Sequence, residues 1–347
     1  MRRILLSLLG TIAALFGSGA FLGWLFSAPK YRGAKSDHFD GRRFHNLPTT
    51  AHAGFFDMVR WMANREKGEW QQWREITPAA PPPRRVAGGA LRVTWVNHST
   101  FLIQTENLNI LTDPIWSERC SPASFMGPKR HHAPGIRFED LPPIDVVLIS
   151  HNHYDHMDEP TLARLTREHH PRIVTGLGNS AFLKKALRHE AVDLDWWQST
   201  ELSTDVRLHA VPAQHFSSRG TTDRDANLWC GFVLETPHGP IYFAGDTGWG
   251  PHFATLRERF GAMRLALLPI GAYRPEWFMC AVHISPKDAV RAAQALGATV
   301  SIPMHYATFN LGDDGQDEPA QVLREELART PGVRFDVLDP GGTWTGF

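Results

Sequence analysis

The chain has 347 residues, a length that suits one large domain or two small ones, and its 36 Lys and Arg residues balance its 36 Asp and Glu residues. The zero net charge argues against a dedicated nucleic-acid-binding protein, and an apolar content of 42% excludes a disordered chain. Cys120, Cys230 and Cys280 lie far apart without a Cys-x-x-Cys pair, so we expect neither disulfides nor a thiolate metal site, but small side chains in or near the core.

The chain starts with a long uncharged segment, residues 4–28. Its length meets the need of a membrane-spanning helix for about 20 residues. It also fits a signal peptide cleaved after Ala20, or a buried helix. Because residues 21–26 remain strongly apolar beyond that cleavage point, we expect residues 1–29 to form a transmembrane anchor. A cleaved signal segment is the second interpretation.

The charges around this segment conflict over its orientation. Arg2 and Arg3 precede the segment and favour a cytoplasmic amino end, whereas the cations that follow it also prefer the cytoplasm. The cations that follow are Lys30, Arg32, Lys35, Arg42 and Arg43. We therefore expect a membrane-associated protein. The charges do not decide on which side of the membrane the catalytic domain lies, and we slightly prefer an exported, periplasmic domain.

Two further regions differ in pattern. Residues 30–88 have tryptophans on a polar background and include the Pro-rich residues 78–85, which suit a rigid linker or edge crossing. We expect residues 30–88 to be an arm that packs on a catalytic domain formed by residues 89–347.

Short β-rich runs begin at Leu91. Those at residues 91–96, 100–104 and 108–111 predict an antiparallel meander, and the continuous apolar run at 145–150 predicts a buried central strand. Later strands are expected at residues 206–212, 229–235, 240–244, 265–268 and 300–303. Helices are expected at residues 161–170, 180–189, 286–296 and 319–330, the last two with a proline suited to the first turn. This order predicts an α/β (α+β) fold of two sheets with helices outside.

Four polar residues directly follow the predicted central strand: His151, His153, Asp155 and His156. Residues two apart in an extended stretch point the same way, so His151 and His153 can bind one metal ion from one side. Asp155 and His156 lie beyond the turn and can reach a second ion. Imidazole and carboxylate are the usual zinc ligands, and burying them together without a cation is costly.

Further ligands follow later strands. His215, Asp246 and His305 each come after a predicted β run, at the positions where loops carry function. Gly245 and Gly248 flank Asp246 and permit a tight turn there. A single histidine at a strand end is more often structural. In this order, after the four-residue motif, these side chains predict a two-metal site.

This series of ligands resembles the metallo-β-lactamase superfamily: an H-x-H-x-D-H motif, a histidine, an Asp in a Gly-Asp-Thr segment and a final histidine. Longer segments between residues 40 and 325 resemble the N-acylphosphatidylethanolamine-hydrolysing phospholipase D family. They are residues 94–100, 111–116, 126–130, 141–156, 195–197, 212–215, 243–248 and 269–273.

The resemblance implies a four-layer αβ/βα sandwich with two Zn²⁺ ions per chain. It assigns the first zinc to His151, His153 and His215. It assigns the second zinc to Asp155, His156 and His305, with Asp246 bridging both ions. All of these positions hold the expected residue types, which argues against a degenerate enzyme. The resemblance also allows a homodimer.

The activity that the resemblance implies is hydrolysis of a phospholipid at a membrane. N-acylphosphatidylethanolamine would give N-acylethanolamine and phosphatidic acid. Two zinc ions about 3.5–4 Å apart can share a water and lower its pKa toward 7, and the resulting bridging hydroxide attacks phosphorus. Asp155 is expected to orient this water or take its proton.

Other residues are assigned around this centre. His283 aligns with a family histidine and is expected to contact the phosphate or protonate the leaving group, although capping of the following helix explains it equally well. Val282 before it departs from the polar residue of the animal enzymes, so head-group recognition differs. Further head-group contacts are expected from Asn227 and Arg219. The apolar residues Tyr273, Trp277, Phe278 and Met279 suit either an acyl-chain or bilayer contact or ordinary core packing.

Other functions fit the same ligands. A lactonase or another phosphoester hydrolase would use this site on a soluble substrate. A redox protein would hold iron there. The neutral charge and the lack of a basic tract argue against a nuclease, and the complete ligand set argues against a non-catalytic membrane scaffold.

Overall fold

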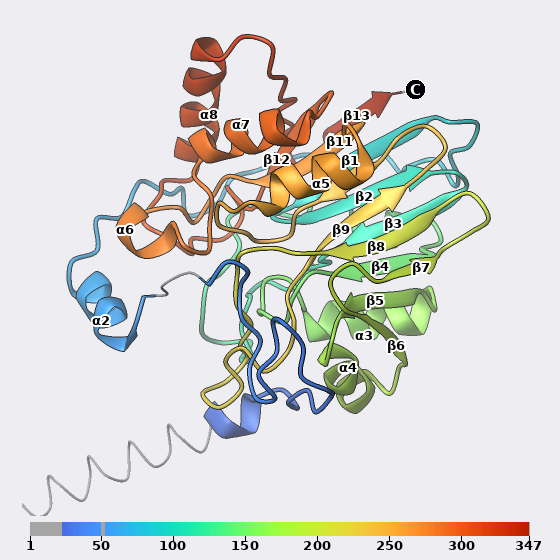
Figure 1. Cartoon of the computed structure of the whole chain (residues 1–347). Helices are drawn as coiled ribbons and strands as arrows, with labels where there is room; N and C mark the ends of the chain where they lie inside the picture. The colour runs from blue at the N-terminus through green and yellow to red at the C-terminus, as the bar shows by residue number, and fades with distance from the viewer. Residues whose placement is uncertain (1–22, 50–52, 347) are drawn as a thin grey trace, which may run out of the picture.

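Two β-sheets packed face to face form the centre of the computed structural model, and helices lie on their outer sides (Figure 1). The structure describes residues 23–49 and 53–346. The first sheet has, in order, β13 (Thr343–Gly346), β1 (Leu91–Asn97), β2 (Thr100–Thr105), β3 (Leu108–Thr112), β4 (Val146–Ile149), β5 (Arg172–Gly176) and β6 (Ala191–Leu194). The second has β12 (Ser301–Met304), β11 (Leu265–Pro269), β10 (Ile241–Phe243), β9 (Gly231–Glu235), β8 (Arg207–Val211) and β7 (Ser199–Glu201).

Each sheet combines an antiparallel part with a parallel part. In the first sheet, β13 to β3 are antiparallel and β3 to β6 are parallel. In the second sheet, β7 to β10 are antiparallel and β10 to β12 are parallel. The predicted meander of β1, β2 and β3 is confirmed. Parallel strands direct their carboxyl ends to one edge, so the loops that follow β10, β11 and β12 start at one edge of the second sheet.

The helices are α2 (Phe55–Ala63), α3 (Glu159–Glu168), α4 (Asn179–Leu187), α5 (His252–Phe260), α6 (Glu276–Met279), α7 (Pro286–Leu296) and α8 (Glu318–Arg329), with a short 3-10 helix at Phe138–Asp140. Helices α3 and α4 lie beside the first sheet, and α5, α7 and α8 lie beside the second (Figure 1). This confirms two sheets with helices outside.

The pattern of β4 shows why the sequence predicts a central strand. Val146 and Leu148 pack in the core between the sheets, which also contains Trp95 and Phe232. Val147 and Ile149 point to the opposite face and pack in a second cluster that contains residues of α3 and α4. Because alternate side chains of a strand face opposite sides, burial on both faces requires the continuous apolar run that β4 has.

The predicted location at a membrane is wrong. In residues 23–49 and 53–346, no helix combines the length and the apolar composition that crossing a membrane requires. The described end of the predicted anchor is one helical turn at residues 23–26, and the backbone N–H of Ala28 donates to Asp223 at 2.8 Å. The expected membrane association and export are therefore withdrawn. Residues 1–22, which hold most of the predicted anchor, lie outside the described residues.

Residues 53–77 run along one side of the catalytic region. The indole N–H of Trp61 on α2 donates to the Asp313 carboxylate at 2.9 Å, and that of Trp70 donates to the Asp314 carbonyl at 2.8 Å. Helix α2 also contacts α6. Of the cysteines, Cys120 and Cys230 are buried as expected, whereas Cys280 is exposed because it follows α6 at the surface.

Candidate metal centre

The side chains predicted to bind metal meet at one edge of the two sheets. The motif that follows β4 supplies His151, His153, Asp155 and His156, and the loops after β8, β10 and β12 supply His215, Asp246 and His305. The ligating atoms form overlapping groups in which all atoms lie within 4.8 Å of one another. The structure therefore brings together every residue that the sequence assigned to metal.

His151, His153 and His215 form the first group. Nδ1 of His153 lies 2.8 Å from Nε2 of His151 and 3.3 Å from Nε2 of His215. Burial lowers the pKa of His151 and His215 well below the usual value, and neighbouring histidines lower it further. The pKa of His153 falls to about 4, mainly through burial. These rings are neutral at pH 7, so each has a nitrogen lone pair to offer.

Asp155, His156, His305 and His98 form the second group. Oδ2 of Asp155 lies 3.1 Å from Nε2 of His156 and 3.4 Å from Nε2 of His305. His98 is not among the ligands predicted from the sequence. Nε2 of His98 lies 2.9 Å from the same Asp155 oxygen.

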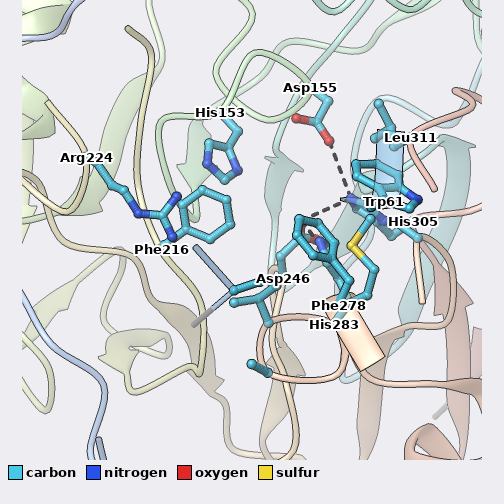
Figure 2. A pocket seen from close by; sticks show the side chains of 15 residues that line it. Trp61, His153, Asp155, Phe216, Arg224, Asp246, Phe278, His283, His305 and Leu311 are labelled. Atoms are coloured by element: carbon cyan, nitrogen blue, oxygen red, sulfur yellow. Dashed lines mark ion pairs between the residues drawn. The ribbon is translucent and has the colours of Figure 1, made fainter. Parts of the chain in front are cut away.

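Asp246 lies between the two groups. Its Oδ2 is 3.0 Å from Nε2 of His305 and 3.1 Å from that of His156. On the other side it is 3.8 Å from Nε2 of His215 and 3.9 Å from that of His151. Figure 2 marks the ion pairs of His305 with Asp155 and with Asp246. One carboxylate oxygen is therefore within reach of ligands from both groups.

A second layer of contacts orients these rings. The Asp113 carboxylate accepts from Nδ1 of His156 at 2.7 Å and from the Ser150 hydroxyl at 2.6 Å. The Ser150 hydroxyl is also 2.9 Å from Nδ1 of His151. Nδ1 of His215 donates to the Val282 carbonyl at 3.0 Å. These contacts occupy the outer nitrogen and direct Nε2 to the centre, as outer partners of metal-binding histidines do.

The charge balance of the cluster fits a cation. Oδ1 of Asp246 is buried without a hydrogen-bond partner among the described residues, and Nε2 of His156 and His305 are buried with ion-pair contacts to Oδ2 of Asp246 but no well-aligned hydrogen bond. Burial lowers the pKa of His305, but Asp246 and Asp155 outweigh this effect and raise it to about 9. The ring is therefore protonated when no metal ion neutralises the carboxylates. Neutral imidazoles and carboxylates are the donor set of zinc and similar divalent ions, so these residues fit metal binding.

A cavity of about 260 Å³ opens above the cluster. In Figure 2, Trp61 and Leu311 lie on the right beside His305, and Arg224 and Phe216 lie on the left beside His153. The rings of Trp61 and Phe278 stack with centroids 4.9 Å apart. The cavity therefore has an apolar wall on one side, and the guanidinium of Arg224 beside the Phe216 ring on the other.

His283 lines this cavity. Its Nδ1 lies 4.0 Å from Oδ2 of Asp246, and burial lowers its pKa to about 4. Capping does not explain His283, because Ser285 is the N-cap of α7 and its hydroxyl accepts from the Asp288 backbone N–H.

The other expected substrate contacts have different surroundings. The Arg219 guanidinium is buried and donates to the backbone carbonyls of Asn152 and Met157, and Asn227 is fully buried away from the cavity. Neither is placed to contact a head group. In the predicted apolar patch, Phe278 and Met279 line the cavity, whereas Trp277 is exposed and the hydroxyl of Tyr273 donates to Glu318 at 3.0 Å.

Comparison with known proteins agrees with this geometry. A model of the beta-lactamase superfamily domain matches residues 108–306. N-acyl-phosphatidylethanolamine-hydrolyzing phospholipase D 1 of Caenorhabditis elegans is 34% identical over 273 residues, which cover 73% of this chain and 75% of that protein. A metal-dependent hydrolase of Pyrobaculum islandicum is 28% identical over 256 residues, which cover 73% and 99%.

The fold also matches a solved structure. A metallo hydrolase of Ignicoccus hospitalis superimposes with a TM-score of 0.57 at 21% identity, over 74% of this chain and 99% of that one. The chain is a metal-dependent hydrolase of the metallo-β-lactamase superfamily, and within it the chain belongs to the family of N-acylphosphatidylethanolamine-hydrolysing phospholipase D-like proteins.

Proposed function

We propose that this hydrolase is a dinuclear zinc phosphodiesterase of phospholipase D type, which converts N-acylphosphatidylethanolamine to N-acylethanolamine and phosphatidic acid. The position of Asp246 is the main support, because its Oδ2 lies between two groups of ligands below the cavity. The reaction in the name of the C. elegans relative supports the choice of substrate.

Each proposed zinc ion has its own set of ligands. The first set is His151, His153 and His215, the second is Asp155, His156 and His305, and Asp246 serves both. Zinc held by these residues would lower the pKa of a water molecule toward about 7 and would neutralise charge on a phosphoryl group.

Asp155 has one oxygen free for the reaction. Its Oδ2 faces His98, His156 and His305, whereas Oδ1 has no hydrogen bond or ion pair with another described residue. Asp155 also lines the cavity. Burial raises its pKa, but the adjacent histidines outweigh that effect and hold it well below the usual value. We assign Oδ1 of Asp155 to orienting the attacking water and accepting its proton.

His283 and the apolar wall position the substrate. As a neutral ring beside Asp246, His283 is suited to donate an N–H to a phosphoryl oxygen. The side chains of Trp61, Phe278, Met279 and Leu311 offer a surface on which an acyl chain excludes water, worth about 0.8 kcal/mol for each buried methylene.

The test is product analysis. Zinc-loaded protein is incubated with N-acylphosphatidylethanolamine in detergent micelles, and the products are identified by mass spectrometry. Asp246→Asn should lose more than about 100-fold in turnover, since even outer partners of metal ligands contribute 10–100-fold. Asp205→Asn, an exposed carboxylate far from the cluster, is the matched control and should keep full activity.

Two results would change the proposal. Normal turnover of Asp246→Asn would remove that residue from the site. If the parent protein forms neither product, the phosphodiester substrate is wrong. Lactones and phosphoesters of soluble sugars would then be the next substrates to test on the same centre. Metal analysis of protein prepared without added metal must find zinc, because predominant redox-active iron would contradict the zinc assignment.

A further inference from the structure

A second cavity, of about 600 Å³, adjoins the catalytic cavity and is strongly basic. We call it the basic pocket. Its charged lining residues are Lys30, Arg32, Arg42, Arg43 and Arg224, with Asp40 as the one carboxylate among them. Five cations face one anion here, although the whole chain has equal numbers of both.

Four of the five cations of the basic pocket are not paired with a carboxylate of the described residues, and the fifth, Arg224, has its Nε 3.6 Å from the Asp225 carboxylate. The side chains of Lys30, Arg32, Arg42 and Arg43 are exposed and form no ion pair with a carboxylate of the described residues. Asp40 is engaged elsewhere. Its carboxylate accepts from the backbone N–H groups of Arg42 and Arg43 at 2.7 and 2.8 Å, and from Nε2 of His45 at 3.1 Å. Asp40 therefore shapes the turn and leaves the guanidinium groups free.

The turn that carries these arginines is held in place. Phe39 and Phe44 pair as an antiparallel bridge, and both are buried in the main core. The backbone N–H of Phe44 donates to the Asp225 carbonyl at 2.7 Å, and that of Tyr31 donates to the Ala226 carbonyl at 3.0 Å. The charged tips are thus presented by a fixed backbone, which lowers the entropic cost of binding a ligand.

Arg224 connects the basic pocket to the catalytic cavity, because it lines both. Its guanidinium lies 4.3 Å from the centroid of the Phe216 ring. Phe216 in turn packs against His153, with centroids 4.5 Å apart. Figure 2 shows Arg224 and Phe216 on the side of the ligands opposite Trp61 and Leu311. A group in the basic pocket would therefore lie away from the apolar wall.

We propose that the basic pocket binds a second anionic group, a phosphate or a carboxylate, next to the phosphodiester that is cleaved. Guanidinium groups suit both because they offer paired N–H donors to two oxygens. The anion is either part of the substrate, which rests on the function proposed above, or a free phosphate ester that occupies the pocket by itself. The substrate class is then an amphiphile with an acyl chain on the Trp61 side and an additional negative charge on the Arg224 side.

The test compares the parent protein with R42Q/R43Q. These exposed side chains can be replaced without losing the turn, since Asp40 holds the backbone of both residues, and a thermal melt checks the fold. The matched control is K67Q/R84Q. It removes the same charge at two exposed residues that form no ion pair with the described residues and do not line the basic pocket.

One arm measures binding without catalysis. Titration calorimetry with sn-glycerol 3-phosphate should give a Kd about tenfold weaker in R42Q/R43Q than in the control, a change of about 1.4 kcal/mol. The other arm measures kcat/KM for N-acylphosphatidylserine and N-acylphosphatidylethanolamine in the same micelles. These lipids differ by one carboxylate on the head group.

The outcomes separate the two sources of the anion. The parent is tested for a higher kcat/KM on N-acylphosphatidylserine than on N-acylphosphatidylethanolamine. A fall of this ratio by about tenfold in R42Q/R43Q supports an anion carried by the substrate, because one charge-assisted contact contributes about that much. Weaker glycerol 3-phosphate binding with an unchanged preference supports a free phosphate ester. If neither quantity differs from the control, the proposal is overturned. If no lipid is hydrolysed, the proposed function is wrong, and the calorimetric titration with sn-glycerol 3-phosphate alone tests the basic pocket.

Discussion

At the scale of single residues, His98 determines how Asp155 is held. Burial lowers the pKa of His98 to about 3, and the nearby His305 adds to this effect. The ring is neutral at pH 7, so an Nε2–H can donate to the Asp155 carboxylate at 2.9 Å. His98 has a positive φ of 44° and lies in the tight β1–β2 turn. The role that this geometry favours is positioning of Asp155.

If the centre holds the two metal ions proposed above, we expect His98→Ala to weaken binding of one of them about 10–100-fold, the usual effect of losing an outer partner, and to leave the other ion bound. The measurement is a competition titration with a chelator of known affinity. His98→Gln, which keeps an N–H donor, should restore part of the loss. His132→Ala is the control, because His132 is also buried but bonds Thr308 and not a ligand. Equal affinity for both ions in His98→Ala and the parent would contradict this role.

The sequence could not identify such outer partners. The metal ligands are recognisable because they are spaced two and three residues apart or follow predicted strands. His98 and Asp113 are isolated along the chain, and they meet their partners across 57 and 43 residues respectively. A contact over such a distance depends on strand order, which sequence spacing does not specify. The only available signal was that both residues lie in segments that resemble the family.

At the scale of elements, the predictions succeeded where burial creates a clear pattern. Strand β4 is apolar on both faces, and α7 begins at Pro286 and ends at Leu296 as predicted. The missed strands are β5, β6, β7 and β13. Strand β5 is buried at four of its five residues, so burial alone did not reveal it, whereas the side chains of the other three are mostly partly buried or exposed. Strands β6, β7 and β13 all lie at sheet edges. An edge strand needs no strict apolar alternation, so its composition resembles that of a loop.

The segment around His38 docks through a titratable contact. Nδ1 and Nε2 of His38 lie 2.5 Å from Asp37 and 2.8 Å from Asp195, and its ring stacks on Trp196 with centroids 4.5 Å apart. Burial lowers the pKa of His38, but the two carboxylates outweigh this effect and raise it above the usual value. Asp37 is exposed and Asp195 partly buried, so Asp195 supplies most of the stabilisation.

This contact predicts a pH dependence of stability. A histidine with a raised folded pKa stabilises the fold fully below its unfolded pKa, and the contribution disappears as pH rises through the folded pKa. We therefore expect His38→Gln to lower the free energy of unfolding by roughly 1.5 kcal/mol at pH 6, as for a hydrogen bond to a charged group, and by less at pH 9. Urea unfolding at both pH values measures this, with the exposed His45 replaced by Gln as control. The same loss at both pH values would contradict it.

At the scale of the whole molecule, the metal centre joins the two sheets. His151, His153, Asp155 and His156 follow β4 of the first sheet, whereas His215, Asp246 and His305 follow β8, β10 and β12 of the second. The segment before β1 contributes as well, because the side-chain amide of Asn46 donates to the His215 carbonyl at 2.9 Å, and its oxygen accepts from the His215 N–H at 3.1 Å. Metal binding therefore couples segments that are distant along the chain.

A ligand that binds only the folded state stabilises it by mass action. Free zinc at 1,000 times its Kd should thus raise the free energy of unfolding by about 4 kcal/mol over chelator-treated protein. Each kcal/mol of added stability raises Tm by about 2–4 °C in a domain of about 150–250 residues, and by less in a longer chain. We therefore expect zinc to raise Tm by about 10 °C in a thermal melt. Asp246→Asn, which replaces the negatively charged carboxylate within reach of both groups by a neutral amide, should gain much less from zinc, while Asp205→Asn should gain as much as the parent. Superimposable melts of the parent with zinc and with chelator would show that the ligand cluster does not hold the sheets together through metal.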